Sequence, residues 1–254
     1  MAGHSKWSKI KRQKKAEDQA RGRLFSKLGR EIAVAARDGG DDPDFNPRLR
    51  TAIETAKAEN MPADNIERAI KRGTGDLPGV AYEEATYEGY GPGGAALYIE
   101  CVTDNTNRTV AELRHLIDKA GGNLGTAGSV AWMFERKGRI AVDSSRYDEE
   151  SLLEAALAAG AEDLASDEDE HLITTSVQDF HTVQDALREQ GIEWERAELA
   201  MIPTSTMPVA GGEATRLVRL VGELEDHDDV MNLYTNFEVD DAVLEALAPQ
   251  QASD

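Results

Sequence analysis

Apolar residues in the first third of the chain recur at the spacing of α-helices. Leu24, Leu28, Ile32 and Ala35 fall on one face of a helix that starts near Arg21 and stops at a Gly-Gly pair. Two more amphipathic patterns follow, and the second of them ends in a basic turn before a glycine. These patterns predict a small domain of three short helices joined by tight loops.

The two later helices have clear start and stop signals. Asn46 followed by Pro47 is typical of an N-cap with proline at the first helical position. Pro62 begins the third helix, and Gly73 is expected to end it. The glycine-rich stretch 73–79 then predicts a linker.

Beyond residue 79 the spacing changes to that of β-strands. Segments 82–90 and 95–103 flank a Gly-Pro-Gly-Gly sequence, which predicts a hairpin. A helix is expected over residues 107–119 and a further strand over 130–134.

The order strand, helix, strand, strand, helix, strand over residues 139–202 predicts a ferredoxin-like arrangement. A helix at 213–224 and a strand at 232–239 have no local partners, so we assign them to the sheet begun at 82–134. The predicted fold class is α+β with three domains: a helical N-terminal domain and two α/β-sandwich domains, one ferredoxin-like and inserted in the other. The predicted boundaries are 1–78 for the basic arm and helical domain, 79–135 plus 206–244 for the middle domain, and 136–205 for the inserted domain.

The net charge of −20 is unevenly distributed along the chain. Residues 1–30 contain ten lysines and arginines against two acidic residues, a balance of +8. Residues 76–254 contain 11 basic and 37 acidic residues, a balance of −26. Such polarity is typical of a protein whose basic end meets a polyanion while the rest is repelled from it. An acidic surface that serves only solubility is the alternative for the body of the chain.

The basic N-terminal segment is the strongest candidate for a binding site. Residues 1–20 contain few large apolar side chains, chiefly Trp7 and Ile10, so we expect this segment to order only on binding. Lysine and arginine release counterions from phosphates, and Trp7 would stack on an unpaired base. A solvated basic tail, with Trp7 packed on the helices, is the alternative. The predicted nucleic-acid-binding residues are Lys6, Trp7, Lys9, Lys11, Arg12, Lys14, Lys15, Arg21 and Arg23.

Two other motifs have ordinary structural explanations. Gly89–Gly94 lacks the Gly-Lys-Ser/Thr end of a phosphate-binding loop, which favours a hairpin turn. Asp104–Arg108 either caps the following helix or holds an anion, and capping is the stronger interpretation. The helix is expected to start at Asn107 or at a Thr109/Glu112 capping pair.

No pattern in the sequence marks a catalytic or metal site. The five histidines are scattered, no serine lies in a Gly-x-Ser-x-Gly turn, and the acidic turn 167–170 is expected to be solvated. The lone Cys101 lies in an apolar run, which predicts core packing and excludes an internal disulfide. We expect a non-enzymatic protein with no metal, no cofactor and no small-molecule substrate.

The sequence also gives no sign of a membrane segment. No stretch approaches the roughly 18 consecutive apolar residues of a membrane helix. The basic start is not followed by the apolar region of a secretory signal. We therefore expect a cytoplasmic protein with no membrane partner.

Gly3-His-Ser-Lys-Trp7 is the first of several motifs that extend over most of the chain. The others are Ala20–Leu28, Asn60–Gly73, Tyr87–Gly94, Thr103–Thr109 and Gly121–Phe134. Together they resemble the YebC/PmpR family, whose mitochondrial relatives are translational activators of cytochrome c oxidase. The likeness is specific through about residue 140 and looser in the acidic C-terminal half.

The resemblance implies a helical domain followed by two nested α+β domains, and a cytoplasmic regulator of gene expression without enzymatic activity. It implies one of two partners. Duplex DNA is the partner of a transcriptional regulator, which is our first hypothesis. Ribosomal RNA is the partner of a ribosome-associated translation factor that relieves stalls at sequences such as proline runs, which is our second. A scaffold that binds other proteins through its acidic domains is a third.

Overall fold

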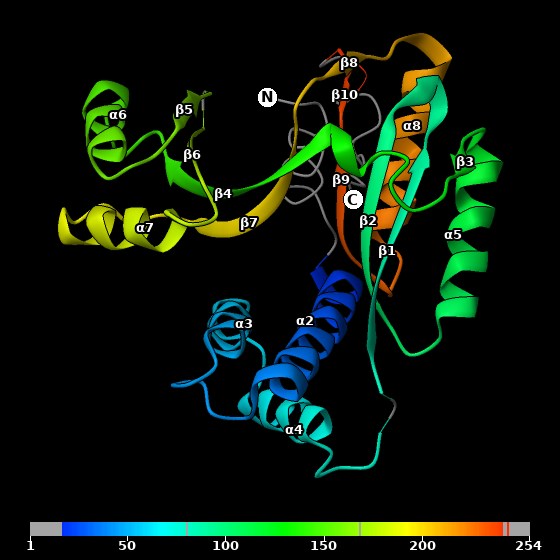
Figure 1. The fold of residues 1–254 in the computed structure, drawn as a ribbon, viewed down its shortest axis with the longest axis horizontal. Helices are drawn as coiled ribbons and strands as arrows, with labels where there is room; N and C mark the ends of the chain where they lie inside the picture. The colour runs from blue at the N-terminus through cyan, green and yellow to red at the C-terminus, as the bar shows by residue number, and fades with distance from the viewer. Residues whose placement is uncertain (1–16, 80, 168, 241–242, 244–254) are drawn as a thin grey trace, which may run out of the picture. The chain divides into compact units, whose positions relative to one another are not determined.

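The computed structural model describes residues 17–79, 81–167, 169–240 and 243. This part of the chain combines helices with mainly antiparallel sheets, which confirms the α+β fold class (Figure 1). Trp132–Ser205 form one compact unit, and the described residues up to Ala131 and from Thr206 onward form another. The finer boundaries of the three predicted domains stay a prediction.

Three helices in the first third of the chain pack on one another. Their bounds are Glu17–Gly39 for α2, Pro47–Ala58 for α3 and Ala63–Thr74 for α4. Ile32, Leu49 and Ile66, one from each helix, belong to a single apolar core. Asn46 caps α3 as predicted, because its side-chain oxygen accepts from the backbone N–H of Leu49 at 3.0 Å. Its amide nitrogen also donates to the carbonyl oxygen of Ala35 at 2.7 Å, which ties α3 to α2.

The end of α4 differs from the prediction. The helix continues through Gly73 to Thr74, and Gly75 provides the left-handed cap with a φ of 85°. Gly73 serves a close packing contact instead, because a Cβ there would overlap the carbonyl oxygen of Ala33 in α2. Sequence position alone does not distinguish a glycine that ends a helix from one that lets two backbones approach.

An antiparallel sheet covered by two helices follows. Its strands lie in the order β3-β1-β2-β9, with bounds Glu83–Tyr90 for β1, Ala96–Thr103 for β2, Asn123–Leu124 for β3 and Val230–Thr235 for β9. The helices are Thr106–Ala120, α5, and Gly211–Glu225, α8. The predicted hairpin joins β1 to β2 through the short turn Pro92–Gly94. Leu97 of β2, Leu113 of α5 and Leu217 of α8 are fully buried in one core, so both helices pack on the same face of the sheet.

The predicted strand at residues 130–134 is wrong. Residues Ala131–Met133 form a 3-10 turn, and the sheet edge beside β1 is taken by the two-residue β3. The buried carboxylate of Glu88 explains the turn, because it accepts from three backbone N–H groups that a strand would otherwise pair. These belong to Gly128, Val130 and Ala131, at 2.6 to 2.7 Å.

The unit Trp132–Ser205 has the predicted ferredoxin-like order. Its elements are Phe134–Asp143 for β4, Glu149–Ala158 for α6, Asp163–Ser166 for β5, Glu170–Thr175 for β6, Phe180–Glu189 for α7 and Arg196–Pro203 for β7. The antiparallel sheet has the order β5-β6-β4-β7. Ile140 and Ile173 of this sheet share a core with Leu152 of α6 and Val183 of α7, which places both helices on one face.

A short parallel pair, Met207–Pro208, β8, and Phe237–Glu238, β10, completes the other unit. The predicted strand 232–239 is therefore divided between β9 and β10. Within the described residues, no helix combines the length and the apolar character that crossing a bilayer requires.

Replacing Gly73 with alanine is expected to lower the free energy of unfolding by about 1–3 kcal/mol, because the added methyl group forces α2 and α4 apart. Gly22→Ala in α2 is the matched control. The space around Gly22 is open, so alanine should raise stability by up to about 1 kcal/mol through its helix propensity. Urea titration measures both effects, and stabilisation by both substitutions would contradict the close approach of the two helices.

Candidate functional site

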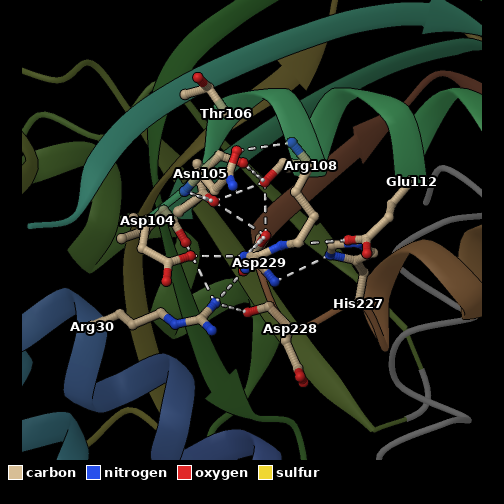
Figure 2. Close-up of polar contacts among 12 residues, drawn as sticks. Arg30, Asp104, Asn105, Thr106, Arg108, Glu112, His227, Asp228 and Asp229 are labelled. Carbon is tan, nitrogen blue, oxygen red and sulfur yellow. Dashed lines mark hydrogen bonds and ion pairs between the residues drawn. The ribbon is translucent and has the colours of Figure 1, made fainter. Parts of the chain in front are cut away.

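A buried carboxylate, that of Asp229, lies at the centre of a network of polar side chains (Figure 2). Asp229 is 2% exposed. One carboxylate oxygen accepts from Arg30 at 2.8 Å, and the other accepts from Arg108 at 2.8 Å. The second oxygen also accepts from the hydroxyl groups of Thr109, at 2.7 Å, and Thr103, at 3.2 Å. A carboxylate removed from water keeps its charge only with partners of this kind.

Segments distant in sequence supply these groups. Arg30 comes from α2, Thr103 ends β2, and Arg108 lies in the first turn of α5. Asp229 follows α8, in the turn before β9. The network therefore joins the cationic helix α2 to two parts of the α+β fold within the same unit.

The segment Asp104–Arg108 caps α5, which confirms the capping interpretation preferred from the sequence. The capping residue is Asn105, whose side-chain oxygen accepts from the backbone N–H of Arg108 at 3.1 Å. The predicted starts at Asn107 or at the Thr109/Glu112 pair are wrong, because those residues lie inside the helix. The guanidinium group of Arg108 binds the carboxylates of Asp104 and Asp229, each at 2.8 Å. Its positive charge is therefore paired within the protein.

Burial by itself raises the pKa of Asp229. Hydrogen bonds from Arg108 and Thr109, with the charges of Arg30 and Arg108, outweigh this effect, so the pKa of the carboxyl group lies below its usual range. The hydrogen bond to Asp229 in turn raises the pKa of Arg108. The carboxylate of Asp229 is therefore ionised at neutral pH and pairs with two guanidinium groups.

Two further basic residues of α2 contact the turn after α8. Lys27 donates to the carbonyl oxygen of Glu225 at 2.7 Å, and the guanidinium group of Arg23 lies 3.7 Å from the carboxylate of Asp226. Together with Arg30, these side chains hold one side of α2 against an acidic turn.

A cavity of about 930 Å³, lined by both basic and acidic side chains, adjoins the network. Within it, Glu112, His227 and Asp229 each bring a possible metal-ligand atom to within 4.8 Å of the others. Both oxygens of Asp229 already bind arginine, and two guanidinium charges oppose a cation at this position. His227 accepts from the backbone N–H of Asp229 through Nδ1, and its Nε2 lies 3.1 Å from Glu112. These residues fit an ion-pair network better than a metal centre.

Two family models match most of the chain. Residues 5–76 match the model described as the TACO1/YebC protein N-terminal domain. Residues 82–237 match the model described as the TACO1/YebC second and third domain. The chain belongs to the TACO1/YebC family. The resemblance to the YebC/PmpR family is thereby confirmed.

Relatives within the TACO1/YebC family are similar over their full length. A protein of Persephonella marina named "Probable transcriptional regulatory protein" is 54% identical, over 98% of this chain and 100% of the relative. A protein of the same name from Desulfatibacillum aliphaticivorans is 55% identical, over 96% of this chain and 99% of the relative. A crystal structure described as the conserved hypothetical protein Aq1575 from Aquifex aeolicus is 49% identical, with a TM-score of 0.81. That match covers 88% of this chain and 93% of the solved one.

The structure places only two of the predicted binding residues of this TACO1/YebC protein. Arg21 and Arg23 lie near the start of α2. Because α2 begins at Glu17, the last four residues of the segment 1–20 are helical, contrary to the expectation that all of it lacks structure. The binding role of all these residues stays a prediction. Outside the described residues lie Lys6, Trp7, Lys9, Lys11, Arg12, Lys14 and Lys15.

Sequence reasoning missed the Asp229 network. The family motif Thr103–Thr109 contains three of its members and marks a polar cluster at a helix start. The available signal for Asp229 was an acidic turn between two strongly apolar elements, but no local pattern connects that turn to Arg30.

Replacing Asp229 with asparagine is expected to lower the free energy of unfolding by about 3 kcal/mol, because Arg30 and Arg108 lose their shared negative partner. Glu112→Gln is the control, since that half-exposed carboxylate forms surface pairs worth at most about 1 kcal/mol. Chemical denaturation at pH 7 measures both variants. Equal stability of Asp229→Asn and the parent chain would contradict the network's role.

Acid should remove part of the same stabilisation. Burial raises the pKa of Glu88, but three backbone N–H donors outweigh it, so Glu88, like Asp229, has a lowered pKa in the folded chain. Each carboxylate therefore contributes stability that is complete above the unfolded value of about 4 and lost as the pH falls through the folded value. We expect the melting temperature to fall below about pH 4, and to fall less steeply in Asp229→Asn. Thermal unfolding monitored from about pH 3 to 7 tests this.

Proposed function

We propose that the chain is a nucleic-acid-binding regulator of gene expression that acts in the cytoplasm without catalysis. The observation that carries this proposal is charge segregation: residues 1–30 have a balance of +8, whereas residues 76–254 have a balance of −26. Phosphate chains attract the first segment and repel the second. The relatives named probable transcriptional regulatory proteins support a regulatory role.

Duplex DNA is the first target that we propose, which makes the protein a DNA-binding transcriptional regulator. The lysines and arginines at positions 6–15 directly precede α2 in the sequence, and Arg21 and Arg23 continue the basic series along that helix. Contacts to phosphate would position the protein, and base edges or DNA shape would supply specificity.

A ribosome-associated translation factor that relieves stalls is the second candidate. The composition of residues 1–20 favours it, because Trp7 stands among cations in a segment with few other apolar side chains. Such a segment suits irregular RNA, whose unpaired bases stack on aromatic rings.

The use of the buried ionisable groups supports a role without catalysis. The carboxylates of Asp229 and Glu88 are saturated by donors of the protein itself. Burial raises the pKa of the Cys101 thiol to about 12, so it remains protonated and unreactive at neutral pH. Each of these perturbed groups has a structural explanation.

Reversing Lys6, Lys9, Lys11 and Arg12 to glutamate is expected to weaken binding to nucleic acid by roughly 100-fold or more at about 100 mM salt, because four phosphate contacts become repulsive. Fluorescence anisotropy with labelled DNA and RNA measures the loss, and circular dichroism should show an unchanged fold.

The matched control reverses four exposed basic residues of the acidic segment 76–254 to glutamate and so makes the same change in net charge. It should weaken binding far less, and equal losses in the two variants would contradict a localised binding arm. The control residues are Arg114, Lys119, Arg136 and Arg219.

The two targets are separated by co-sedimentation with ribosomes and by binding to promoter fragments at matched salt. The transcriptional hypothesis predicts tight duplex binding and little protein in the ribosome pellet. Pelleting at physiological salt with only weak duplex binding would contradict it and support the translation hypothesis.

A further inference from the structure

A second cavity, of about 270 Å³, lies between α2 and α4. We propose that this cavity, the α2–α4 groove, binds a phosphodiester group of the nucleic-acid strand on which the protein acts. The inference rests on the proposed function and gives it a specific site outside the N-terminal arm. The residues that matter are Ser26 and Gly29 of α2, Asn65, Arg68 and Arg72 of α4, and Tyr82 before β1.

The spacing of polar residues on α4 builds one wall of the groove. Asn65, Arg68 and Arg72 stand at positions i, i+3 and i+7, so they follow one side of the helix. Small residues of α2 face them. Ser26 is exposed, and a Cβ placed on Gly29 would meet nothing nearer than Met61 Cε at 3.8 Å, so the groove stays open.

The arginines of α4 are oriented but not neutralised. Arg68 donates through Nε to the carbonyl oxygen of Asp64 and through Nη2 to the side-chain oxygen of Asn65, both at 3.1 Å. Neither acceptor is a carboxylate, and three N–H groups of the guanidinium remain. Arg72 forms no ion pair within the described residues, and no carboxylate there lines the groove. In a chain with 48 acidic residues, this is a local concentration of uncompensated positive charge.

The neighbouring Lys71 shows the contrast on the same helix. Its ammonium group lies 2.5 Å from the carboxylate of Glu67, so its charge is paired. Lys71 is not among the lining residues of the groove. The helix therefore keeps its paired cation outside the groove and its unpaired cations inside it.

A phosphodiester fits this chemistry. Guanidinium groups present planar forks of N–H donors that match phosphate oxygens. The guanidinium carbon of Arg30 lies 5.7 Å from the ring centroid of Tyr82, and this ring offers an aromatic surface at the groove on which a sugar or base can pack. The volume lies below the range typical of sites for drug-sized ligands and suits one unit of a polymer better.

The first test replaces Arg68 and Arg72 with glutamine in the full chain. Lys57→Gln with Lys71→Gln is the control, since it removes the same charge from α3 and α4 outside the groove. Anisotropy with single-stranded RNA and with duplex DNA, between about 50 and 300 mM KCl, should show at least roughly tenfold weaker binding for the arginine variant. The salt slope should also become shallower by about one to two counterions. The control should lose much less.

A second test measures directly whether nucleic acid covers the groove. Cys101, the sole cysteine, is 2% exposed, so Ser26→Cys introduces one reactive thiol into the groove. Saturating nucleic acid should slow alkylation of this thiol severalfold, whereas the thiol of Thr51→Cys on the exposed side of α3 should react at an unchanged rate. Protection by RNA alone, or by DNA alone, supports the groove and identifies the strand.

The outcomes separate the groove from the proposed function. If the parent chain binds nucleic acid, while the arginine variant binds equally well and the thiol of Ser26→Cys is not protected, the groove is not the site and the proposed function stands. If the parent chain binds neither RNA nor DNA, the proposed function and the groove both fail.

Discussion

The buried negative charge of Asp229 is the constraint on which the arrangement of this unit depends. A carboxylate removed from water is costly unless arginines pair with it, and breaking such a pair typically costs about 3–5 kcal/mol. Arg30 and Arg108 supply the pairing, so α2 has to stay against the turn between α8 and β9 for as long as the carboxylate is ionised. Among the described helices α2 has the most basic residues, and it is thereby attached to the turn between α8 and β9.

Two sets of basic residues in the N-terminal third differ in their partners. Lys27 and Arg30 form hydrogen bonds with the turn after α8, and the guanidinium group of Arg23 lies 3.7 Å from Asp226 there. Arg68 and Arg72 make no ion pair with the described acids and remain available to an external anion. Under the proposed function, the acidic segment 76–254 would limit non-specific contact with phosphate chains, and binding would concentrate where cations lack internal partners.

Local signals predicted much of the fold, and contacts between distant segments account for what they missed. The cap at Asn46, the hairpin before Ala96 and the ferredoxin-like order follow from residue type and spacing, which act within a few positions. The predicted strand at 130–134 does not form because the carboxylate of Glu88, far earlier in the chain, accepts hydrogen bonds from backbone N–H groups of this segment. Asp229 and its arginines were missed for the same reason, and so was the packing role of Gly73. The family motifs indicated where such contacts concentrate, but not which residues meet.

The salt dependence of binding most directly tests the central claim, that the basic N-terminal segment carries the contacts with phosphate. The intact chain is compared with one that begins at Glu17, and the equilibrium constant for a labelled nucleic acid is measured across a range of KCl concentrations. The account predicts a linear fall of log K with log salt for the intact chain, and a shallower, weaker line once residues 1–16 are removed. Coincident lines for the two chains would contradict it.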